Sequence, residues 1–312
     1  MMNIIELTSS EYSELFSSPN HIFNSVSFTQ LNARKCEKIH RLAFSDSKAR
    51  MGITLGQREN VLYSPFSAPF GGFDYRKDES ILKIEEAINA LIQYGKDSNK
   101  TIKITFPPLF YNESLLSKTI ATLINQHAQI EFTEINYHFD LSTFPHFNSL
   151  IDRGARKNLN NAMKQGFVFE KIDNENISDI ERAYNVIKAN RESHGYPLRM
   201  SLSDVLETIK IIPAEFFIVK LNNVDVAAAQ IFHIKQGIAQ VIYWGDAPGY
   251  GASRPMNFLS YKLFEYYYNC GLRILDIGPS TESGKPNYGL CDFKENIGCT
   301  ATLRYTFSLQ PI

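Results

Sequence analysis

The residues best suited to chemistry lie near the end of the chain, around one short apolar segment. Residues 272–277 have the pattern of a short buried strand, which carries Asp276 near its end. A loop containing glycine follows, and then the run Asp292-Phe293-Lys294-Glu295, which we expect to form a short helical turn. A fixed ammonium can stabilise negative charge that develops on an oxygen atom. Lys294 is therefore the first candidate for a functional residue.

Asp276 has two interpretations. A partly buried carboxylate with a raised pKa could accept a proton from an amine, as a general base does. A carboxylate at the end of a strand can instead cap the following loop by accepting hydrogen bonds from backbone N–H groups. We favour the capping role.

Three basic side chains lie on one face of a predicted helix over residues 150–165. Arg153, Arg156 and Lys157 recur at steps of three and four residues. Arginine can hold a phosphate through two parallel hydrogen bonds, so this face could bind a phosphorylated substrate. A solvated basic face with no ligand is an equally good interpretation.

Aromatic residues indicate a second kind of site. The segment from Ser64 to Tyr75 holds two prolines, two glycines and three phenylalanines, so it is unlikely to form regular structure. Tyr63 and Phe70 are candidates for the wall of a substrate pocket, although the segment could also be a packed connection. Tyr243 and Trp244, at the end of a predicted strand, are further candidates, and Trp244 could equally be a core residue.

A glycine-containing loop precedes the predicted helix over residues 257–271. Gly249, Gly251 and Ala252 would place backbone N–H groups at the start of that helix, where a pyrophosphate binds well. A plain surface loop would have the same composition.

Composition excludes several classes of protein. The chain has 312 residues, enough for two domains, and a hydrophobic fraction of 44% that can form real cores. Its net charge of −1 predicts no general attraction to nucleic acid or to an anionic membrane. We expect no membrane span, because no run of about 18 apolar residues exists, and no secretory signal, because the N-terminus lacks a basic region followed by an apolar core. We expect no metal site, because the four cysteines show no ligand spacing. A cytoplasmic protein with free thiols is the prediction.

The order of predicted elements divides the chain in two. The first half reads as strands, the irregular segment, and then helix, strand, helix and strand. A boundary falls near residues 142–149. The second half reads as a helix, a strand, two helices, three antiparallel strands, a helix, a strand, a helical turn and a last strand. We expect Asn222-Asn223 to form a hairpin turn and Ser201 to cap a helix with Asp204.

That order in the second half looks like an N-acetyltransferase lobe of the GNAT kind. Three segments also resemble the FemABX and GNAT-like acyltransferase family: RGARKNLNNAMKQGFVFEK at 153–171, VDVAAAQIFHIKQGIAQVIYWGD at 224–246, and LRILDIGPS followed by GLCDFKENIG at the end. Together they extend over roughly residues 150–308, about half of the chain.

The resemblance implies an α+β fold of two tandem GNAT-like lobes, each a mixed sheet flanked by helices, at 1–145 and 146–312. It implies transfer of an acyl or aminoacyl group, from acyl-CoA or aminoacyl-tRNA, to an amine acceptor in a cleft between the lobes. In the best-known members the acceptor is a peptidoglycan precursor, so a role in cell-envelope or polysaccharide biosynthesis follows. The resemblance also carries charge stabilisation onto Phe293-Lys294, and coenzyme A onto the glycine loop.

Two departures from the family pattern bear on the donor. The chain lacks the long helical arm of some tRNA-using members, and this absence, with the near-neutral charge, disfavours aminoacyl-tRNA. The glycine loop also lacks the basic residue expected upstream of it. An alternative is a non-catalytic GNAT-like protein that binds a nucleotide-sugar or a lipid-linked precursor. The sequence does not indicate the oligomeric state.

Overall fold

The structure, a computed structural model, describes residues 2–311 and divides into two compact units. Of the described residues, unit 1 comprises 2–135, 283–285 and 302–311, and unit 2 comprises 136–282 and 286–301. These bounds differ from the predicted lobes at 1–145 and 146–312, since the end of the last strand returns to unit 1. The assignment of two folding domains stays a prediction, and so does the cleft between them.

Unit 1 consists of strands, four helices and short 3₁₀ turns. The elements are β1 (Asn3–Glu6), α1 (Ser9–Leu15), η1 (Ile22–Asn24), α2 (Val26–Leu31), η2 (Ala33–Lys35), β2 (Lys38–Ser45), β3 (Ala49–Arg58), β4 (Val61–Ser64), β5 (Phe73–Tyr75), α3 (Ile81–Ser98), β6 (Thr101–Thr105), η3 (Leu109–Tyr111) and α4 (Glu113–Asn125). Two strands, β7 (Gln129–Asp140) and β15 (Thr300–Leu309), each run from one unit into the other along the chain.

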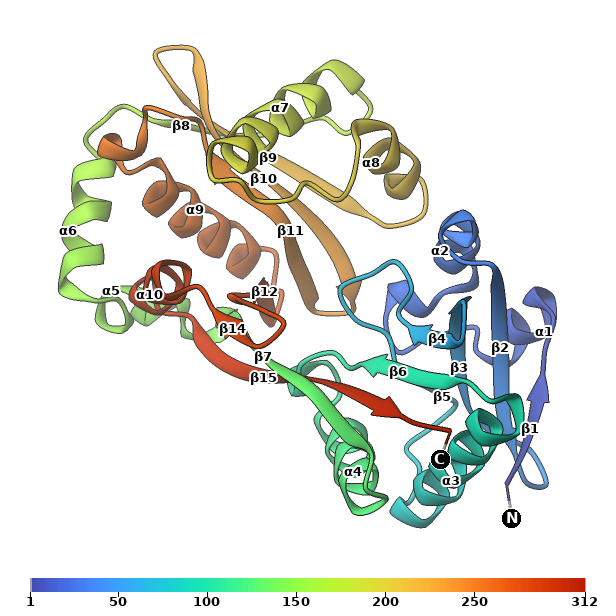
Figure 1. Cartoon of the computed structure of the whole chain (residues 1–312). Coiled ribbons are helices and arrows are strands. Elements are labelled where there is room, and N and C mark those ends of the chain that lie inside the picture. The colour runs from blue at the N-terminus through green and yellow to red at the C-terminus, as the bar shows by residue number, and fades with distance from the viewer. Residues whose placement is uncertain (1, 312) are drawn as a thin grey trace. The chain divides into compact units, whose positions relative to one another are not determined.

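The sheet of unit 1 is mixed and has helices packed on it. Its strand order is β1-β2-β3-β4-β6-β15, with β5 paired to β3. Strands β4 and β6 are parallel, whereas β2 and β3 are antiparallel. Helices α3 and α4 pack side by side (Figure 1). Helix α1 comes so close to β3 that a Cβ on Gly52 would lie 2.6 Å from the Phe16 ring, so only glycine fits there.

Unit 2 has the element order predicted for the second half. The elements are η4 (Leu141–His146), α5 (Phe147–Leu150), α6 (Arg153–Ala162), β8 (Val168–Lys171), α7 (Ile177–Ser193), α8 (Leu202–Ile209), β9 (Ala214–Leu221), β10 (Val224–Lys235), β11 (Ile238–Asp246), η5 (Gly251–Ser253), α9 (Pro255–Asn269), β12 (Ile274–Pro279) and α10 (Tyr288–Asn296). The short strands β13 (Thr281–Glu282) and β14 (Lys285–Pro286) lie between β12 and α10.

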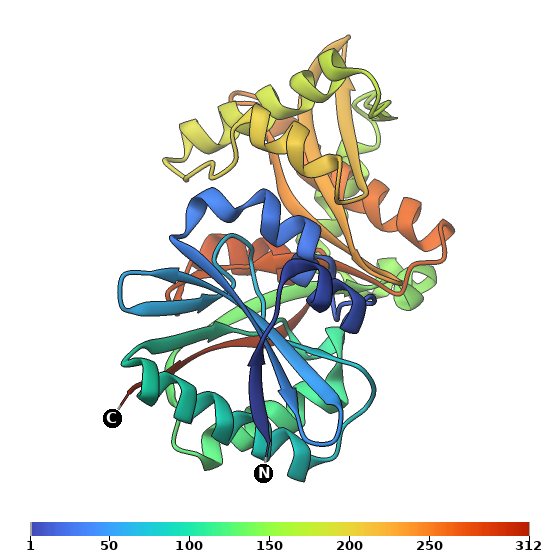
Figure 2. The same cartoon turned by 90° about the vertical axis from the view of Figure 1, so that its right-hand side faces the viewer.

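The sheet of unit 2 has the order β7-β12-β11-β10-β9-β8, in which only β11 and β12 are a parallel pair. Helices α7 and α9 both pack on β10 and β11, and they cover opposite faces of the sheet (Figure 2). The predicted class of mixed sheets flanked by helices is confirmed in both units.

Local predictions in unit 2 are confirmed at one hairpin turn and one helix start, and corrected at two helices. Asn222 and Asn223 both have positive φ, as a tight hairpin turn requires, and Ser201 forms a capping box with Asp204. The predicted helix at 150–165 is shorter, because the Asp152 carboxylate caps a helix that starts at Arg153 and ends at Ala162, whereas Leu150 ends the separate helix α5. The predicted turn at Asp292 is longer than expected and forms the helix α10.

One carboxylate ties together β8, β9, β10 and α9. Glu215 accepts hydrogen bonds from His233 Nε2 at 2.8 Å, from Lys171 Nζ at 2.5 Å, and from the hydroxyls of Tyr266 and Tyr267 at 2.8 and 2.7 Å. Burial alone would raise the pKa of Glu215, but these donors outweigh it and hold that pKa well below its usual range. The ionised carboxylate is thus part of the folded state.

Replacing Glu215 with alanine leaves four donors without their shared acceptor. We expect the free energy of unfolding at pH 7 to fall by about 2–4 kcal/mol, measured by urea denaturation. Because the folded-state pKa is depressed, the wild-type advantage should be present above the ordinary value of 4.5 and should shrink as the pH falls below it. The control is Glu207→Ala, which removes an exposed ion pair and should change stability by less than about 1 kcal/mol. An equal loss of unfolding free energy in both variants would contradict the structural role of Glu215.

Candidate functional site

The parallel strands β11 and β12 separate part of the way along their length. They pair from Ile238–Ile274 to Gln240–Asp276, but β11 continues to Asp246 and β12 to Pro279. Beyond Gln240, no strand among residues 2–311 pairs with the β12-facing edge of β11. The β10–β11 register also shifts there, which leaves Ile242 as a bulge. An unpaired edge of this kind presents backbone N–H and C=O groups to a ligand.

Asp276 lies where the two strands part, and it is 0% exposed. Its carboxylate accepts hydrogen bonds from Asn136 Nδ2 at 2.8 Å, from Gln240 Nε2 at 2.9 Å and from the backbone N–H of Gly278 at 2.9 Å. These bonds link β7, β11 and β12 at a single point. The geometry matches the capping role, and catalysis by Asp276 stays a prediction.

Lys294 lies inside unit 2, with 2% of its surface exposed. Its ammonium donates to three successive carbonyl oxygens of β12, those of Ile277, Gly278 and Pro279, at 3.1, 2.8 and 3.0 Å. Successive carbonyls of a regular strand point in opposite directions, so this convergence needs irregular backbone. It is provided by Gly278, whose φ of 77° favours glycine, and by a register shift after Asp276.

The three carbonyls use all three N–H donors of the Lys294 ammonium. Burial lowers the pKa of Lys294 to about 8, so the side chain still carries its charge at pH 7. Direct contact with a substrate oxygen would require Lys294 to release one carbonyl. In this structure its cation fixes the path of β12 away from β11, and the predicted contact with substrate is untested.

Two of the predicted aromatic residues lie together next to Lys294. The ring of Trp244, near the end of β11, meets the ring of Phe293 on α10 edge-on at 6.1 Å. Tyr243, the preceding residue, faces the other side of the sheet, where its ring lies 5.0 Å from the guanidinium of Arg191 on α7. Trp244, Phe293, Lys294 and Asp276 thus gather around the parted strands.

Arg191 is a candidate that the sequence analysis did not select. Its guanidinium lies over the rings of Tyr243 and Tyr196, at 5.0 and 5.9 Å, and its Nε is buried without a hydrogen-bond partner. Burial lowers the pKa of Arg191 from its ordinary value. The neighbouring Asn190 packs directly on Gly245 of β11, where a Cβ would lie 2.3 Å from the amide carbon. This contact holds the end of α7, and therefore Arg191, against the sheet.

The predicted glycine loop leads from β11 into helix α9. Gly249 has a φ of 90°, and Gly251 and Ala252 are exposed in the 3₁₀ turn η5. No side chain caps the start of α9, whose N-cap is the exposed Arg254 in the left-handed conformation. The loop has no basic residue upstream of it, but Arg254 follows it. A helix start with free N–H groups and a cation suits an anionic ligand.

The remaining predicted residues lie elsewhere. Arg153, Arg156 and Lys157 are exposed on α6. Tyr63 is partly exposed on β4 in unit 1, below the guanidinium of Arg58 at 5.6 Å. Phe70 is 0% exposed and packs on the rings of His21, Phe23 and Tyr111. Contact between Phe70 and a substrate would therefore require this cluster to open.

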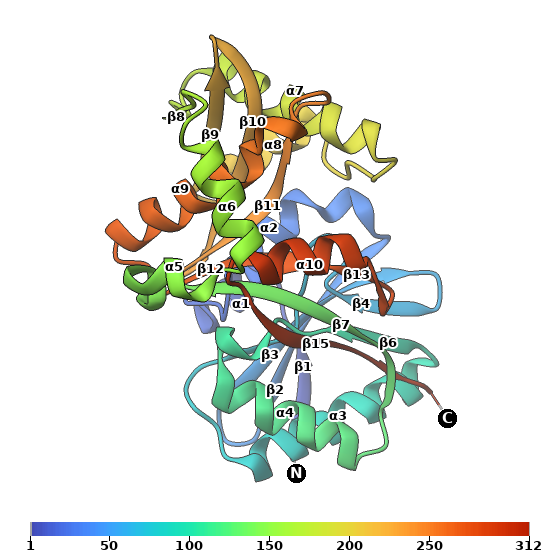
Figure 3. The same cartoon turned by 90° about the vertical axis from the view of Figure 1, so that its left-hand side faces the viewer.

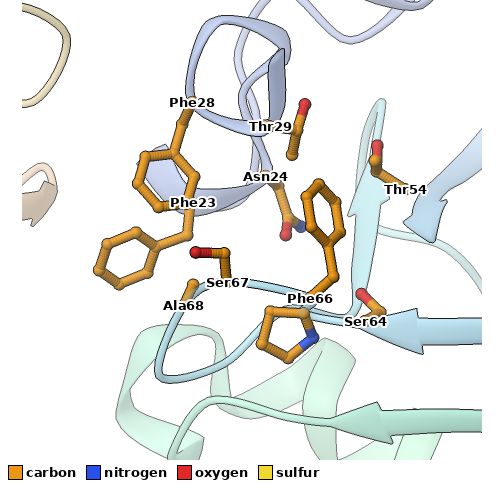
Figure 4. A pocket seen from close by; sticks show the side chains of 10 residues that line it. Phe23, Asn24, Phe28, Thr29, Thr54, Ser64, Phe66, Ser67 and Ala68 are labelled. Carbon is orange, nitrogen blue, oxygen red and sulfur yellow. The ribbon is translucent and has the colours of Figure 1, made fainter. Parts of the chain in front are cut away.

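The segment after β4 does line a small cavity in unit 1. Its walls come from β3, β4, η1, α2 and residues 65–68, with Phe23, Phe28 and Phe66 around it (Figure 4). Its space is about 10 Å³, which is roughly enough for one water molecule. Arg58 and Lys35 fix the segment by donating to Phe66 O and Ser67 Oγ. In this conformation the segment packs as a connection more than it forms a ligand wall.

Within residues 2–311, no group of three histidine, cysteine or acidic residues is arranged to hold a metal ion. No helix in that part of the chain has the length and apolar character needed to cross a membrane.

Replacing Lys294 with methionine removes the ammonium but keeps most of the side-chain volume. Three buried carbonyls then lose their partner, so we expect unfolding at pH 7 to become easier by about 2–4 kcal/mol. The folded-state pKa of about 8 lies below the ordinary 10.5, so the wild type should gain stability relative to the variant as the pH rises from 8 to 10.5. Urea denaturation of both proteins at pH 7 and 10 measures this, and a difference that shrinks with pH would refute the burial effect.

Comparison with known protein families finds no match, and no curated protein sequence matches either. Solved structures do match over nearly the whole chain. FemX has a TM-score of 0.69 at 14% identity, covering 99% of this chain and 97% of that chain. L-PGS from Bacillus licheniformis has a TM-score of 0.60 at 15% identity, covering 97% of this chain and 92% of that chain. A tandem GNAT protein from the clavulanic acid biosynthesis pathway has a TM-score of 0.55 at 9% identity, covering 100% of this chain and 99% of that chain. The chain therefore has the FemABX-like fold of two GNAT-type lobes that the sequence predicted.

Proposed function

We propose that the protein is an N-acyltransferase whose donor binds along the unpaired edge of β11. The observation that carries this proposal is the separation of β11 from β12 beyond Gln240 and Asp276. A donor with amide groups could add to that edge through main-chain hydrogen bonds. Its acyl carbonyl would then lie among backbone N–H groups close to the charge of Lys294.

The proposed reaction at this site is attack by an amine on an activated acyl carbonyl. The carbonyl oxygen gains negative charge, which fixed N–H groups and a nearby cation stabilise in a site shielded from water. No covalent enzyme intermediate is needed, because donor and acceptor can meet in one complex. The new C–N bond forms as the bond from the acyl carbon to the donor's leaving group breaks, and for a thioester the thiolate departs. The Asp276 carboxylate is already occupied by three donors, so we propose that the acceptor amine loses its proton to solvent or to a group of its own, and that the departing thiolate takes up a proton from solvent.

Coenzyme A is the donor carrier that these residues fit best. The N–H groups at the start of α9 and the side chain of Arg254 would hold its phosphates, and coenzyme A would supply the thioester. Gly249 and Gly251 would let the backbone approach those phosphates closely. Aminoacyl-tRNA, an ester donor, is the alternative that the likeness to FemX keeps open.

The acceptor would bring an anionic group to Arg191. The guanidinium lies between two tyrosine rings and makes no ion pair among the described residues. A phosphate or carboxylate could pair with it through two parallel hydrogen bonds. The likeness to FemX, together with the acceptors of the best-known FemABX members, supports an acceptor from cell-envelope biosynthesis.

A second candidate function rests on Lys294. Because its three N–H groups are occupied, the site could bind a nucleotide-sugar or a lipid-linked precursor without catalysis. The Lys294→Ala variant discriminates between the two, provided that it folds. Loss of turnover with retained ligand binding supports the enzyme, whereas absence of turnover in the wild type with every donor supports the binding protein.

Binding of coenzyme A can be measured directly. We expect coenzyme A and acetyl-CoA to raise the melting temperature in a concentration-dependent way. Arg254→Gln should weaken their affinity by about tenfold in isothermal titration, which is about 1.4 kcal/mol. Lys210→Gln, which removes an exposed cation at the end of α8, is the matched control and should bind coenzyme A as tightly as the wild type does. If neither compound shifts the melting temperature, the thioester donor is excluded and aminoacyl esters are tested next.

The role of Arg191 predicts a preference among acceptors. With acetyl-CoA as donor and release of free thiol as the signal, we expect phosphoethanolamine to be a better acceptor than ethanolamine. Arg191→Met should remove the preference by raising KM for the phosphorylated amine, with kcat nearly unchanged. Arg199→Met, a nearby exposed arginine, should keep it. A preference that survives in Arg191→Met would remove Arg191 from the acceptor site.

A further inference from the structure

Arg41, on β2 of unit 1, is a buried cation without a counterion among residues 2–311. It is 5% exposed, and no ion pair of this part of the chain includes it. Its Nη2 makes only two long contacts, of 3.5 Å each, to Thr29 Oγ1 and Gln30 Oε1, and its buried Nε has no hydrogen-bond partner. A guanidinium has five N–H donors, and burying its charge without an anion costs free energy.

The acidic groups around Arg41 do not supply the missing charge. The weak acids that interact with its guanidinium are Tyr12 and Cys36, and burial raises the pKa of both, so both are neutral at pH 7. The Tyr12 hydroxyl donates at 2.9 Å to the buried carboxylate of Asp74. That carboxylate also accepts two hydrogen bonds, of 2.8 and 3.1 Å, from residues that precede α2. Asp74 is therefore held by other donors and does not pair with Arg41.

Arg41 lies beside the small cavity that the segment after β4 lines. Arg41 and Thr54 are partners in the β2–β3 register, so both side chains leave the same face of the sheet. Ala43, two residues further along that face, packs against α1, whereas α3 and α4 lie on the other side of the strands of unit 1 from α2 (Figure 3). Thr54 and Thr29 both line the cavity (Figure 4). Since Arg41 starts beside Thr54 and reaches Thr29, its side chain passes along the cavity wall.

The cavity wall offers a second donor and sets the size of a ligand. Thr54 is 5% exposed, and its hydroxyl lies near that of Tyr12 but makes no hydrogen bond of normal geometry. The space of about 10 Å³ is roughly that of one water molecule, so a phosphate or an organic carboxylate does not fit. A water molecule would bond to Thr54 but would leave the charge of Arg41 uncompensated. A monatomic anion satisfies both groups.

We propose that unit 1 binds one halide ion, such as chloride, between Arg41 Nε and Thr54 Oγ1. The ion accepts a charge-assisted hydrogen bond from the guanidinium and a second hydrogen bond from the hydroxyl. Because Arg41 also contacts Thr29, the bound ion links β2 and β3 to helix α2. The site belongs to unit 1 alone. It does not rest on the proposed acyl transfer, and it can be tested without any activity assay.

The test compares the melting temperature of the full chain in sodium chloride, sodium bromide and sodium gluconate at equal ionic strength, since gluconate is too large for the cavity. When the halide concentration is about five times its Kd, we expect a melting temperature roughly 2 °C higher than in gluconate. Arg41→Met keeps most of the side-chain volume and removes the charge, so the halide effect should vanish. Thr54→Val removes only the hydroxyl and should raise the Kd for halide roughly tenfold.

Arg76→Met is the matched control, because Arg76 is an exposed arginine of unit 1, and this variant should keep the full halide effect. An equal effect of halide in Arg41→Met would mark a general influence of salt and would overturn the proposal. The wild type gives an independent answer even if Arg41→Met does not fold. Crystals grown in sodium bromide should show anomalous scattering within hydrogen-bond distance of Arg41 Nε. A water molecule at that position, without anomalous signal, or an empty cavity would overturn the halide site.

Discussion

The buried ammonium of Lys294 is the interaction on which the geometry of unit 2 depends. By collecting three successive carbonyls of β12, it holds that strand on a path that leaves β11 without a partner. A strand edge inside a sheet is normally paired, because unpaired backbone groups cost free energy when they are buried. Here the carbonyls of one strand are satisfied by a side chain, and the edge of the other strand is left for a ligand.

The charged groups at the junction where β11 and β12 part are also hydrogen-bonded within the protein. Asp276 fixes the point of separation through donors on three strands, and Lys294 fixes the direction that β12 takes afterwards. Both charges are therefore used for architecture, and both are almost fully buried. A transferase built in this way would gain most of its rate from preorganised backbone dipoles and from the approximation of two substrates. In the proposed function, Lys294 and Asp276 would thus shape the site, and backbone groups and the two bound substrates would carry the reaction.

The sequence predicted the elements better than it predicted their contacts. Hydrophobic periodicity and turn residues located α9, β12 and the Asn222-Asn223 hairpin, because each depends on neighbours in the chain. The surroundings of Lys294 could not be predicted, since they depend on the positive φ of Gly278 and on carbonyls that lie 15 to 17 residues earlier in the chain. Arg191 was missed because its tyrosine partners come from a loop and from β11. Phe70 looked like a pocket residue because composition cannot distinguish an irregular segment that packs inward from one that binds.

The net charge of −1 does not describe how charge is distributed over this molecule. The carboxylates of Asp152, Glu215 and Asp276 each accept hydrogen bonds within the protein, and Glu215 also pairs with the Lys171 ammonium. Among residues 2–311 the basic side chains of α6 form no ion pair, although Arg156 donates a hydrogen bond to Ile151 O; the buried Nε of Arg191 has no hydrogen-bond partner. The 32 basic and 33 acidic residues are thus compatible with a locally basic face. The net charge alone therefore does not predict where the surface is locally basic, as it is on α6.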